Sequence, residues 1–163
     1  MKRAIIIGCS GGGKSYFARA LRDRTALPLY HLDNIFWNAD GSHLSKNDFR
    51  EKLQIILDSE EWIIDGNYCS TMEIRMQACD TVFFLDYPTE VCLAGIRERK
   101  GKLRSDMAWQ NPPEDDDEVF IEFVKNYNTQ TRPKVIELLE KYSYKSIVIF
   151  RSREESENYI NSI

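Results

Sequence analysis

The sequence lacks any long apolar run. The run closest to its amino end, Ala4 to Ile7, leads directly into glycines. A secretory signal has a longer apolar core, and a membrane-spanning helix needs about 20 consecutive apolar residues. We therefore expect a cytoplasmic protein with no membrane partner.

The sequence also lacks an excess of positive charge. Its 26 acidic residues outnumber its 22 basic ones, which gives a formal net charge of −4. Domains that coat nucleic acid usually carry a basic stripe and a high isoelectric point. The charge balance argues against direct binding of DNA or RNA.

The cysteines do not form a C-x-x-C pair. Cys9, Cys69, Cys79 and Cys92 are scattered through the first hundred residues, mostly in apolar surroundings. This pattern indicates reduced thiols in a cytoplasmic protein and does not favour a zinc site.

The length and the apolar pattern predict a single α/β domain. The chain has 163 residues, of which 42% are apolar and 29% charged, as in ordinary globular proteins. Short β-branched or aromatic runs alternate with segments of helical periodicity such as Phe49, Leu53 and Ile56. The runs, each expected to be an interior strand, are 3–8, 27–32, 62–65, 81–86 and 146–150. Such alternation predicts right-handed crossovers, a parallel sheet with helices on both faces, and ligands beyond the carboxyl ends of the strands.

A phosphate-binding loop follows the first predicted strand. The segment Gly8-Cys9-Ser10-Gly11-Gly12-Gly13-Lys14-Ser15 fits the pattern G-x-x-x-x-G-K-[ST] and is followed by a predicted helix that begins near Lys14 and includes Tyr16. Glycines allow the backbone amides to point at phosphate oxygens, and the helix start adds a positive dipole end. Lys14 supplies charge to the β and γ phosphates, and Ser15 offers a hydroxyl to Mg²⁺. We therefore predict that the chain binds ATP with magnesium.

Two further aspartates end predicted strands and are candidate magnesium ligands. Asp65 is followed by Gly66, which permits close approach of a ligand, and Asp86 follows Leu85. For Asp86 a role as a helix cap before Pro88 is an equal alternative.

The end of the second predicted strand suggests an acceptor site. Asp33 follows His31-Leu32 and precedes the aromatic pair Phe36-Trp37. A carboxylate at this edge could orient or deprotonate a hydroxyl that attacks the γ-phosphate. The alternatives are a turn residue for Asp33 and packing roles for His31 and Trp37.

Basic residues beyond the fourth predicted strand suggest a lid. The segment 97–104 holds five Lys or Arg residues, and it is followed by Pro112-Pro113 and by five acidic residues at 114–118. Guanidinium groups stabilise the charge that develops on a transferred phosphoryl group. The candidate arginines are Arg75, Arg97, Arg99, Arg104 and Arg132. We predict a lid insertion at about 97–118 that closes over bound triphosphate, with the acidic run as a solvated helix start.

Several motifs together resemble a known family. They are the phosphate loop, Leu29-Tyr30-His31-Leu32-Asp33, Trp62-Ile63-Ile64-Asp65-Gly66-Asn67-Tyr68, Phe84-Leu85-Asp86 and Thr131-Arg132-Pro133. In these the chain resembles the bacterial DNA topology modulation proteins of the FlaR type, a family similar to adenylate kinases. The resemblance implies a three-layer P-loop fold with five parallel strands in the order 2-3-1-4-5 over 1–163, like that of nucleoside monophosphate kinases.

The resemblance also assigns roles to residues. It implies that Asp65 and Gly66 assist magnesium and that Arg99 is a lid arginine. The chain departs from the adenylate-kinase pattern after Gly66, where Asn67-Tyr68-Cys69 replaces Phe-Pro-Arg, and at Gly95, which replaces an earlier lid arginine. Stacking on adenine would then pass to Arg97, and recognition of AMP is in doubt.

Two functions remain open at this point. The first is an ATP-dependent phosphotransferase in which Lys14, Asp33, Arg99 and Arg132 act on a nucleotide or a small hydroxylated acceptor. The second is a nucleotide-dependent regulatory protein that affects DNA topology without phosphotransfer to a small acceptor.

Overall fold

The fold is built on one parallel sheet. The computed structural model describes residues 1–99, 102 and 118–163. The strands are β1 (Arg3–Gly8), β2 (Leu29–His31), β3 (Trp62–Asp65), β4 (Thr81–Leu85) and β5 (Ser146–Phe150), in the order β2-β3-β1-β4-β5. Every pairing is parallel, so all carboxyl ends meet at one edge. The predicted strand order is confirmed.

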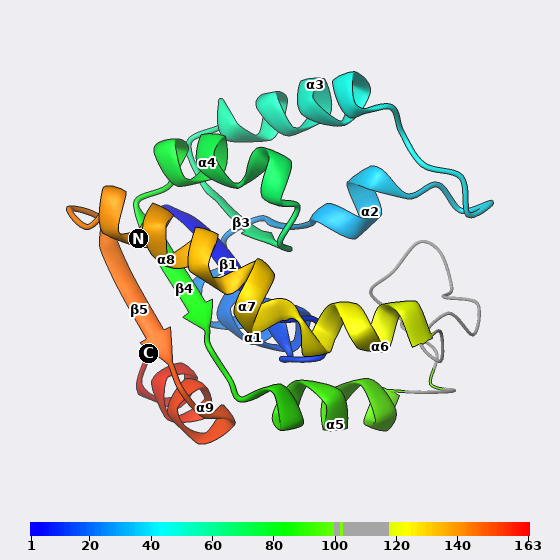
Figure 1. Ribbon diagram of the computed structural model, residues 1–163. Coiled ribbons are helices and arrows are strands. Elements are labelled where there is room, and N and C mark those ends of the chain that lie inside the picture. Colours follow the sequence, from blue (N-terminus) through cyan, green and yellow to red (C-terminus); the bar gives the residue numbers. More distant parts are fainter. Residues whose placement is uncertain (100–101, 103–117) are drawn as a thin grey trace.

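Helices cover both faces of this sheet and complete three layers (Figure 1). They are α1 (Lys14–Thr25), α2 (Leu32–Phe36), α3 (Lys46–Leu57), α4 (Cys69–Ala78), α5 (Thr89–Arg99), α6 (Glu118–Lys125), α7 (Tyr127–Gln130), α8 (Arg132–Lys141) and α9 (Arg153–Ser162). Side chains of α1, α5, α6 and α9 share one core with Ala4 and Ile6 of β1. Side chains of α3, α4 and α8 share the other with Ile5 and Ile7. The isoleucine-rich run alternates between the two cores because successive side chains of a strand point to opposite faces.

The two outer strands correct the expectation that all five are interior. β2 and β5 are edge strands, and β5 leaves Ser146 and Ile149 exposed. β2 is also shorter than the predicted strand 27–32, because Leu32 already starts α2. An edge strand paired on one side needs less apolar cover, which the apolar run alone cannot reveal.

The predicted lid lies only partly within the described residues. Arg97 and Arg99 belong to the regular helix α5, which also contains Gly95. Glu118, the last residue of the acidic run, stands in the first turn of α6. Residues 100–101 and 103–117, including Arg104, lie outside the described residues, so the lid stays a prediction.

None of the helices in the described ranges 1–99 and 118–163 is both long and apolar enough to cross a bilayer.

Candidate active site

The phosphate loop joins β1 to α1 at the centre of the carboxyl edge. Gly13 precedes α1 and provides no side-chain cap, so the first amides of the helix can serve a ligand. Gly11 has φ 80°, and a Cβ there would overlap the Cys92 carbonyl oxygen of α5. Glycine is therefore required at position 11 by both backbone conformation and space. The Gly8 amide donates to Asn67 Oδ1 at 3.1 Å, which links the loop to the end of β3.

Lys14 folds back onto its own loop. Its Nζ donates to the Cys9 carbonyl oxygen at 3.0 Å. Burial lowers the pKa of the ammonium, while the charges of Asp65 and Asp33 oppose that shift. Anionic phosphates would compensate a partly desolvated cation in this position.

Two buried side chains meet at the ends of β2 and β3. His31 and Asp65 are register partners, and Nδ1 of the histidine lies 2.7 Å from Oδ1 of the aspartate. His31 thus packs against the candidate magnesium ligand Asp65 and fixes the orientation of its carboxylate, a role that the sequence did not reveal. Ser15 and Asp65 line the same cavity.

The donor set fits a magnesium ion held mainly by phosphates. Mg²⁺ is usually bound through one or two protein oxygens, with phosphates and water completing its octahedron. Ser15 and Asp65 would supply such oxygens. Within 1–99, 102 and 118–163, no three His, Cys, Asp or Glu side chains gather as a metal-binding group.

Asp33 is held by a tyrosine that the sequence did not single out. The Tyr68 hydroxyl donates to Asp33 Oδ1 at 2.8 Å. Burial and the charge of Asp33 raise the pKa of Tyr68, so the phenol stays protonated and remains a donor. Tyr68 packs against Phe36 and Phe49, which fixes its ring.

Arg75, a predicted phosphate-binding arginine, has a different role. It is fully buried. Its guanidinium donates to the carbonyl oxygens of Gly66 at 2.9 Å and of Asn67, Tyr68 and Thr71. Burial lowers its pKa to about 10. Arg75 therefore holds the loop after β3 in place and is not available to a ligand.

Asp86 and Arg132 are joined to each other. Arg132 Nε and Nη2 lie 2.7 and 2.8 Å from the two carboxylate oxygens of Asp86, and Arg151 also pairs with Oδ2. Neither Asp86 nor Arg132 lines the cavity described below. The helix α5 begins at Thr89, after Pro88. This geometry does not favour magnesium coordination by Asp86. It also directs the Arg132 guanidinium to Asp86 and away from a role in phosphoryl transfer.

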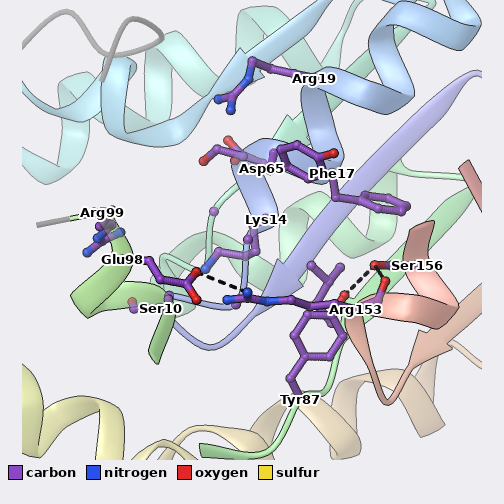
Figure 2. Close-up of a pocket in the computed structure, with 18 of the residues that line it drawn as sticks. Ser10, Lys14, Phe17, Arg19, Asp65, Tyr87, Glu98, Arg99, Arg153 and Ser156 are labelled. Atoms are coloured by element: carbon purple, nitrogen blue, oxygen red, sulfur yellow. Dashed lines mark hydrogen bonds and ion pairs between the residues drawn. The ribbon is translucent and has the colours of Figure 1, made fainter. Parts of the chain in front are cut away.

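A single cavity of about 1190 Å³ connects most of the predicted residues (Figure 2). Typical small-molecule pockets are about 300–1,000 Å³, so this one has room for a nucleotide and a second molecule. Its lining includes Ser10, Gly11, Gly12, Gly13, Lys14, Ser15, Tyr16, Asp33, Trp37, Asp65 and Arg99. Gly8, Cys9 and Arg97 are not part of the lining, so Gly8 and Cys9 would serve through the loop backbone.

The far wall of the cavity comes from α5, α6 and α9. Arg153 of α9 donates to Glu98 of α5 at 3.2 Å, as the dashed line in Figure 2 shows. The Arg99 guanidinium lies 5.9 Å from the centre of the Phe120 ring. Arg153 was not predicted, although its position just after the last strand places it at the ligand edge. Phe120 was not predicted because it belongs to none of the sequence motifs described above.

Comparisons with known proteins agree with this fold. No protein-family model matches the chain. The uncharacterized protein YqaC of Bacillus subtilis (strain 168) is 33% identical over 105 residues, which span 61% of this chain and 58% of that protein.

Three solved shikimate kinases share the whole architecture. The enzyme from Acinetobacter baumannii, in complex with shikimate, has a TM-score of 0.66 at 13% identity and is covered over 90% of its length. The enzymes from Bacteroides thetaiotaomicron and Aquifex aeolicus have TM-scores of 0.61 and 0.56 at 19% and 18% identity, covered over 95% and 92%. Between 98% and 99% of the present chain is aligned in each case.

The chain therefore has the P-loop kinase fold, with the phosphate loop at the carboxyl edge of a 2-3-1-4-5 sheet. These comparisons do not show the DNA topology modulation family, so that resemblance stays a prediction.

Proposed function

We propose that this protein transfers the γ-phosphoryl group of ATP to a hydroxyl of a small acceptor bound beside Asp33. The observation that carries the proposal is the continuity of one cavity from the phosphate loop to Asp33 and Trp37. A nucleotide-binding protein without an acceptor needs no carboxylate and aromatic wall on the far side of the γ-phosphate position.

The donor half of the site consists of the phosphate loop, Lys14, Ser15 and Asp65. The loop amides and Lys14 would bind the β and γ phosphates, and Ser15 and Asp65 would hold Mg²⁺ directly or through water. Bound magnesium supplies charge neutralisation between those phosphates. Arg99, which lines the opposite wall, is positioned to stabilise charge on the transferred group.

The acceptor half is centred on Asp33. Its carboxylate would accept the proton of the attacking hydroxyl as the new O–Pγ bond forms and the bond from Pγ to the bridging oxygen of ADP breaks. Tyr68 holds that carboxylate in orientation through its 2.8 Å hydrogen bond. Trp37 lines the same cavity and offers an apolar surface to the body of the acceptor.

The position of Arg75 favours an uncharged acceptor over a nucleoside monophosphate. A phosphate on the acceptor would need its own cation, and of the basic residues that line the cavity beside Asp65, Lys14 is assigned to the phosphates of ATP and Arg19 remains (Figure 2). Arg75, the arginine that follows the Asp65–Tyr68 loop, donates its hydrogen bonds to main-chain carbonyl oxygens and is not available to the acceptor. We therefore place nucleosides and neutral polyols ahead of nucleoside monophosphates among the acceptor classes.

The test is acceptor-dependent release of ADP. Purified protein with ATP and Mg²⁺ is assayed against nucleosides, neutral polyols, AMP and shikimate, with Asp33→Asn as the variant. We expect one neutral class to raise ADP release well above the rate with water, and Asp33→Asn to abolish that increase. Salt-sensitive retention of DNA, with no acceptor raising ADP release, would instead favour the nucleotide-dependent regulatory protein.

A further inference from the structure

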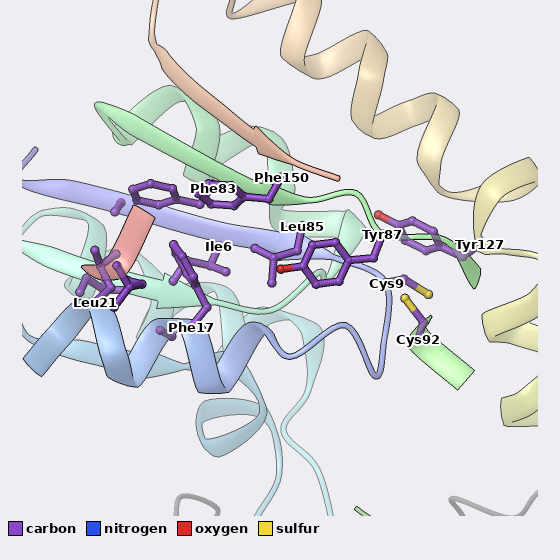
Figure 3. Close-up of a cluster of buried hydrophobic side chains, with 14 of the residues drawn as sticks. Ile6, Cys9, Phe17, Leu21, Phe83, Leu85, Tyr87, Cys92, Tyr127 and Phe150 are labelled. Carbon is purple, nitrogen blue, oxygen red and sulfur yellow. The ribbon is translucent and has the colours of Figure 1, made fainter. Parts of the chain in front are cut away.

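Two thiols meet beneath the phosphate loop. Cys9 belongs to the loop and Cys92 to α5, so the two residues are far apart in the sequence. Figure 3 shows the two sulfur atoms facing each other, and each thiol shifts the pKa of the other. Both side chains are buried, with 3% and 0% exposure, and both are free thiols. Proximity of two thiols is the geometric requirement for a disulfide.

The helix carrying Cys92 packs directly on the loop. A Cβ at Gly95 would overlap the Gly11 carbonyl oxygen, and one at Gly12 would lie 3.8 Å from Cys92 Sγ. Gly11, Gly12 and Gly95 all line the cavity. Gly12 therefore lies next to Cys92 Sγ and also lines the cavity, so a molecule as small as hydrogen peroxide would approach the thiol pair from this side.

We propose that Cys9 and Cys92 form a disulfide on exposure to a peroxide, and that this disulfide weakens triphosphate binding at the loop. The second half of the proposal rests on the proposed function of the loop. The chemistry consumes one hydrogen peroxide and two thiols. One sulfur attacks a peroxide oxygen and breaks the O–O bond, which yields a sulfenic acid and water. The other sulfur then attacks the sulfenic sulfur, forms the S–S bond and releases a second water.

The local electrostatics favour Cys92 as the first sulfur. The neighbouring Cys9 thiol lowers the pKa of Cys92, and the positive charges of Lys14 and Arg153 act in the same direction. The neighbouring Cys92 thiol and burial raise the pKa of Cys9. Cys92 would therefore be the attacking thiolate, with Cys9 as the resolving thiol.

The effect on binding follows from the place of Cys9 in the loop. Its carbonyl oxygen accepts from Lys14 Nζ at 3.0 Å and from the Gly12 amide at 3.1 Å. Closing an S–S bond of about 2.05 Å would draw Cys9 toward α5 and shift this carbonyl. Displacements of about 1 Å in a positioned site cost roughly 100-fold in function. We therefore expect a loss of triphosphate affinity of at least tenfold.

The coupling must also operate in reverse. A ligand that binds the reduced form more tightly disfavours oxidation by the same factor. Bound triphosphate also covers Gly11 and Gly12 on the cavity side. We expect a non-hydrolysable ATP analogue with Mg²⁺ to slow disulfide formation.

The experiment treats the whole protein with hydrogen peroxide and maps peptides without reduction by mass spectrometry. We expect a Cys9–Cys92 cross-linked peptide, two hydrogens lighter than the sum of its parts, whose yield falls with the ATP analogue present. Binding of a fluorescent ATP analogue should weaken at least tenfold and recover with dithiothreitol. The Cys92→Ala variant should bind the ATP analogue normally, and peroxide should not change its affinity. The matched variant Cys79→Ala, which removes another buried thiol, should still lose affinity after peroxide treatment.

Three results would overturn parts of this scheme separately. If exposed Cys69 is oxidised completely while no Cys9–Cys92 peptide forms, the disulfide is refuted. If the peptide forms and affinity is unchanged, the effect on binding is refuted. If the reduced protein does not bind the analogue at all, the proposed function is refuted. Peptide mapping then still decides whether the Cys9–Cys92 disulfide forms.

Discussion

Tyr68 is the residue through which the acceptor site is organised. Its backbone has φ 35°, a left-handed conformation held by the carbonyl contacts of Arg75. This geometry brings the hydroxyl to Asp33 across 35 positions of sequence. Asp33 therefore owes its orientation to a loop after a different strand.

Replacing Tyr68 by phenylalanine tests that positioning role. The ring would keep its packing on Phe36 and Phe49, and the variant would lose the hydroxyl's hydrogen bond to Asp33 together with its interaction with Trp37. A hydrogen bond to a charged group contributes about 1.5–3 kcal/mol, so kcat should fall roughly 10- to 100-fold. KM for ATP should be unchanged, since the donor half is untouched. Steady-state kinetics beside Tyr144→Phe, an exposed matched control, check this; an equal rise in both KM values would contradict it.

Lys14 is the cation that the proposed mechanism assigns to the phosphates of ATP. Lys14→Ala removes the cation that serves the phosphates and leaves the core intact, so ATP affinity or turnover should fall roughly 100-fold or more. Titration with a fluorescent ATP analogue measures the affinity, and thermal unfolding without nucleotide verifies the fold. Lys52→Ala, at an exposed position of α3, is the matched control. Unchanged affinity in Lys14→Ala would remove the phosphate-loop assignment.

Asp65, the last residue of β3, is the proposed magnesium ligand. Asp65→Asn keeps the size of the side chain beside His31 and removes the negative charge that magnesium requires. We expect magnesium-dependent turnover to fall much more than magnesium-free nucleotide binding. A magnesium titration of both properties, with exposed Asp23→Asn as control, separates the two. Equal losses would indicate structural damage at β3 instead.

At the scale of elements, the contact of α5 with the phosphate loop leaves no room for a side chain. Gly95 stands where a Cβ would overlap the Gly11 carbonyl oxygen. Alanine is normally favoured over glycine in a helix by about 1 kcal/mol. Here Gly95→Ala should instead destabilise the protein by about 1–3 kcal/mol, the usual cost of overpacking, and weaken ATP binding as the loop shifts.

Chemical denaturation and nucleotide titration of Gly95→Ala measure both effects. Gly41→Ala is the control, because Gly41 also has positive φ, at 82°, and yet a Cβ there meets nothing within 4 Å. It should lose some stability without any change in nucleotide affinity. A stabilised Gly95→Ala would show that α5 does not pack on the loop as described.

The same contact shows how far sequence reasoning reaches. The phosphate loop and the alternation of strands and helices follow from local patterns, since each depends on residues close in sequence. The strand order follows from the resemblance to a known family. Arg75 and the pair of Asp86 with Arg132 could not be assigned in this way. Their partners are backbone carbonyls or side chains up to 65 positions away, and in a sequence an arginine that binds carbonyls cannot be told from a surface arginine.

The edge positions of β2 and β5 were missed for a related reason. An apolar run shows that a strand is covered on its faces and says nothing about whether both neighbours exist. Only the assembled sheet shows that β5 pairs with β4 alone.

At the scale of the whole molecule, the two halves of the cavity tie the outer helices to the central loop. Lys14 and Tyr16 belong to α1, Arg99 to α5 and Arg153 to α9, and all four line the cavity. A nucleotide bound here would contact elements that otherwise meet through few polar bonds, such as that of Arg153 with Glu98. Ligand binding should therefore stabilise the fold as a unit.

This expectation is tested by thermal unfolding with and without a non-hydrolysable ATP analogue and Mg²⁺. A ligand at 100 times its Kd adds about 2.7 kcal/mol to the free energy of unfolding, because it binds only the folded state. For a chain of this size each kcal/mol raises Tm by about 2–4 °C, so the wild type should gain about 5–11 °C. Lys14→Ala should gain almost nothing under the same conditions, while Lys52→Ala should gain as much as the wild type. A neutral hydroxylated acceptor should then raise Tm further in wild type and less in Asp33→Asn; an equal gain in both would place the acceptor elsewhere than beside Asp33.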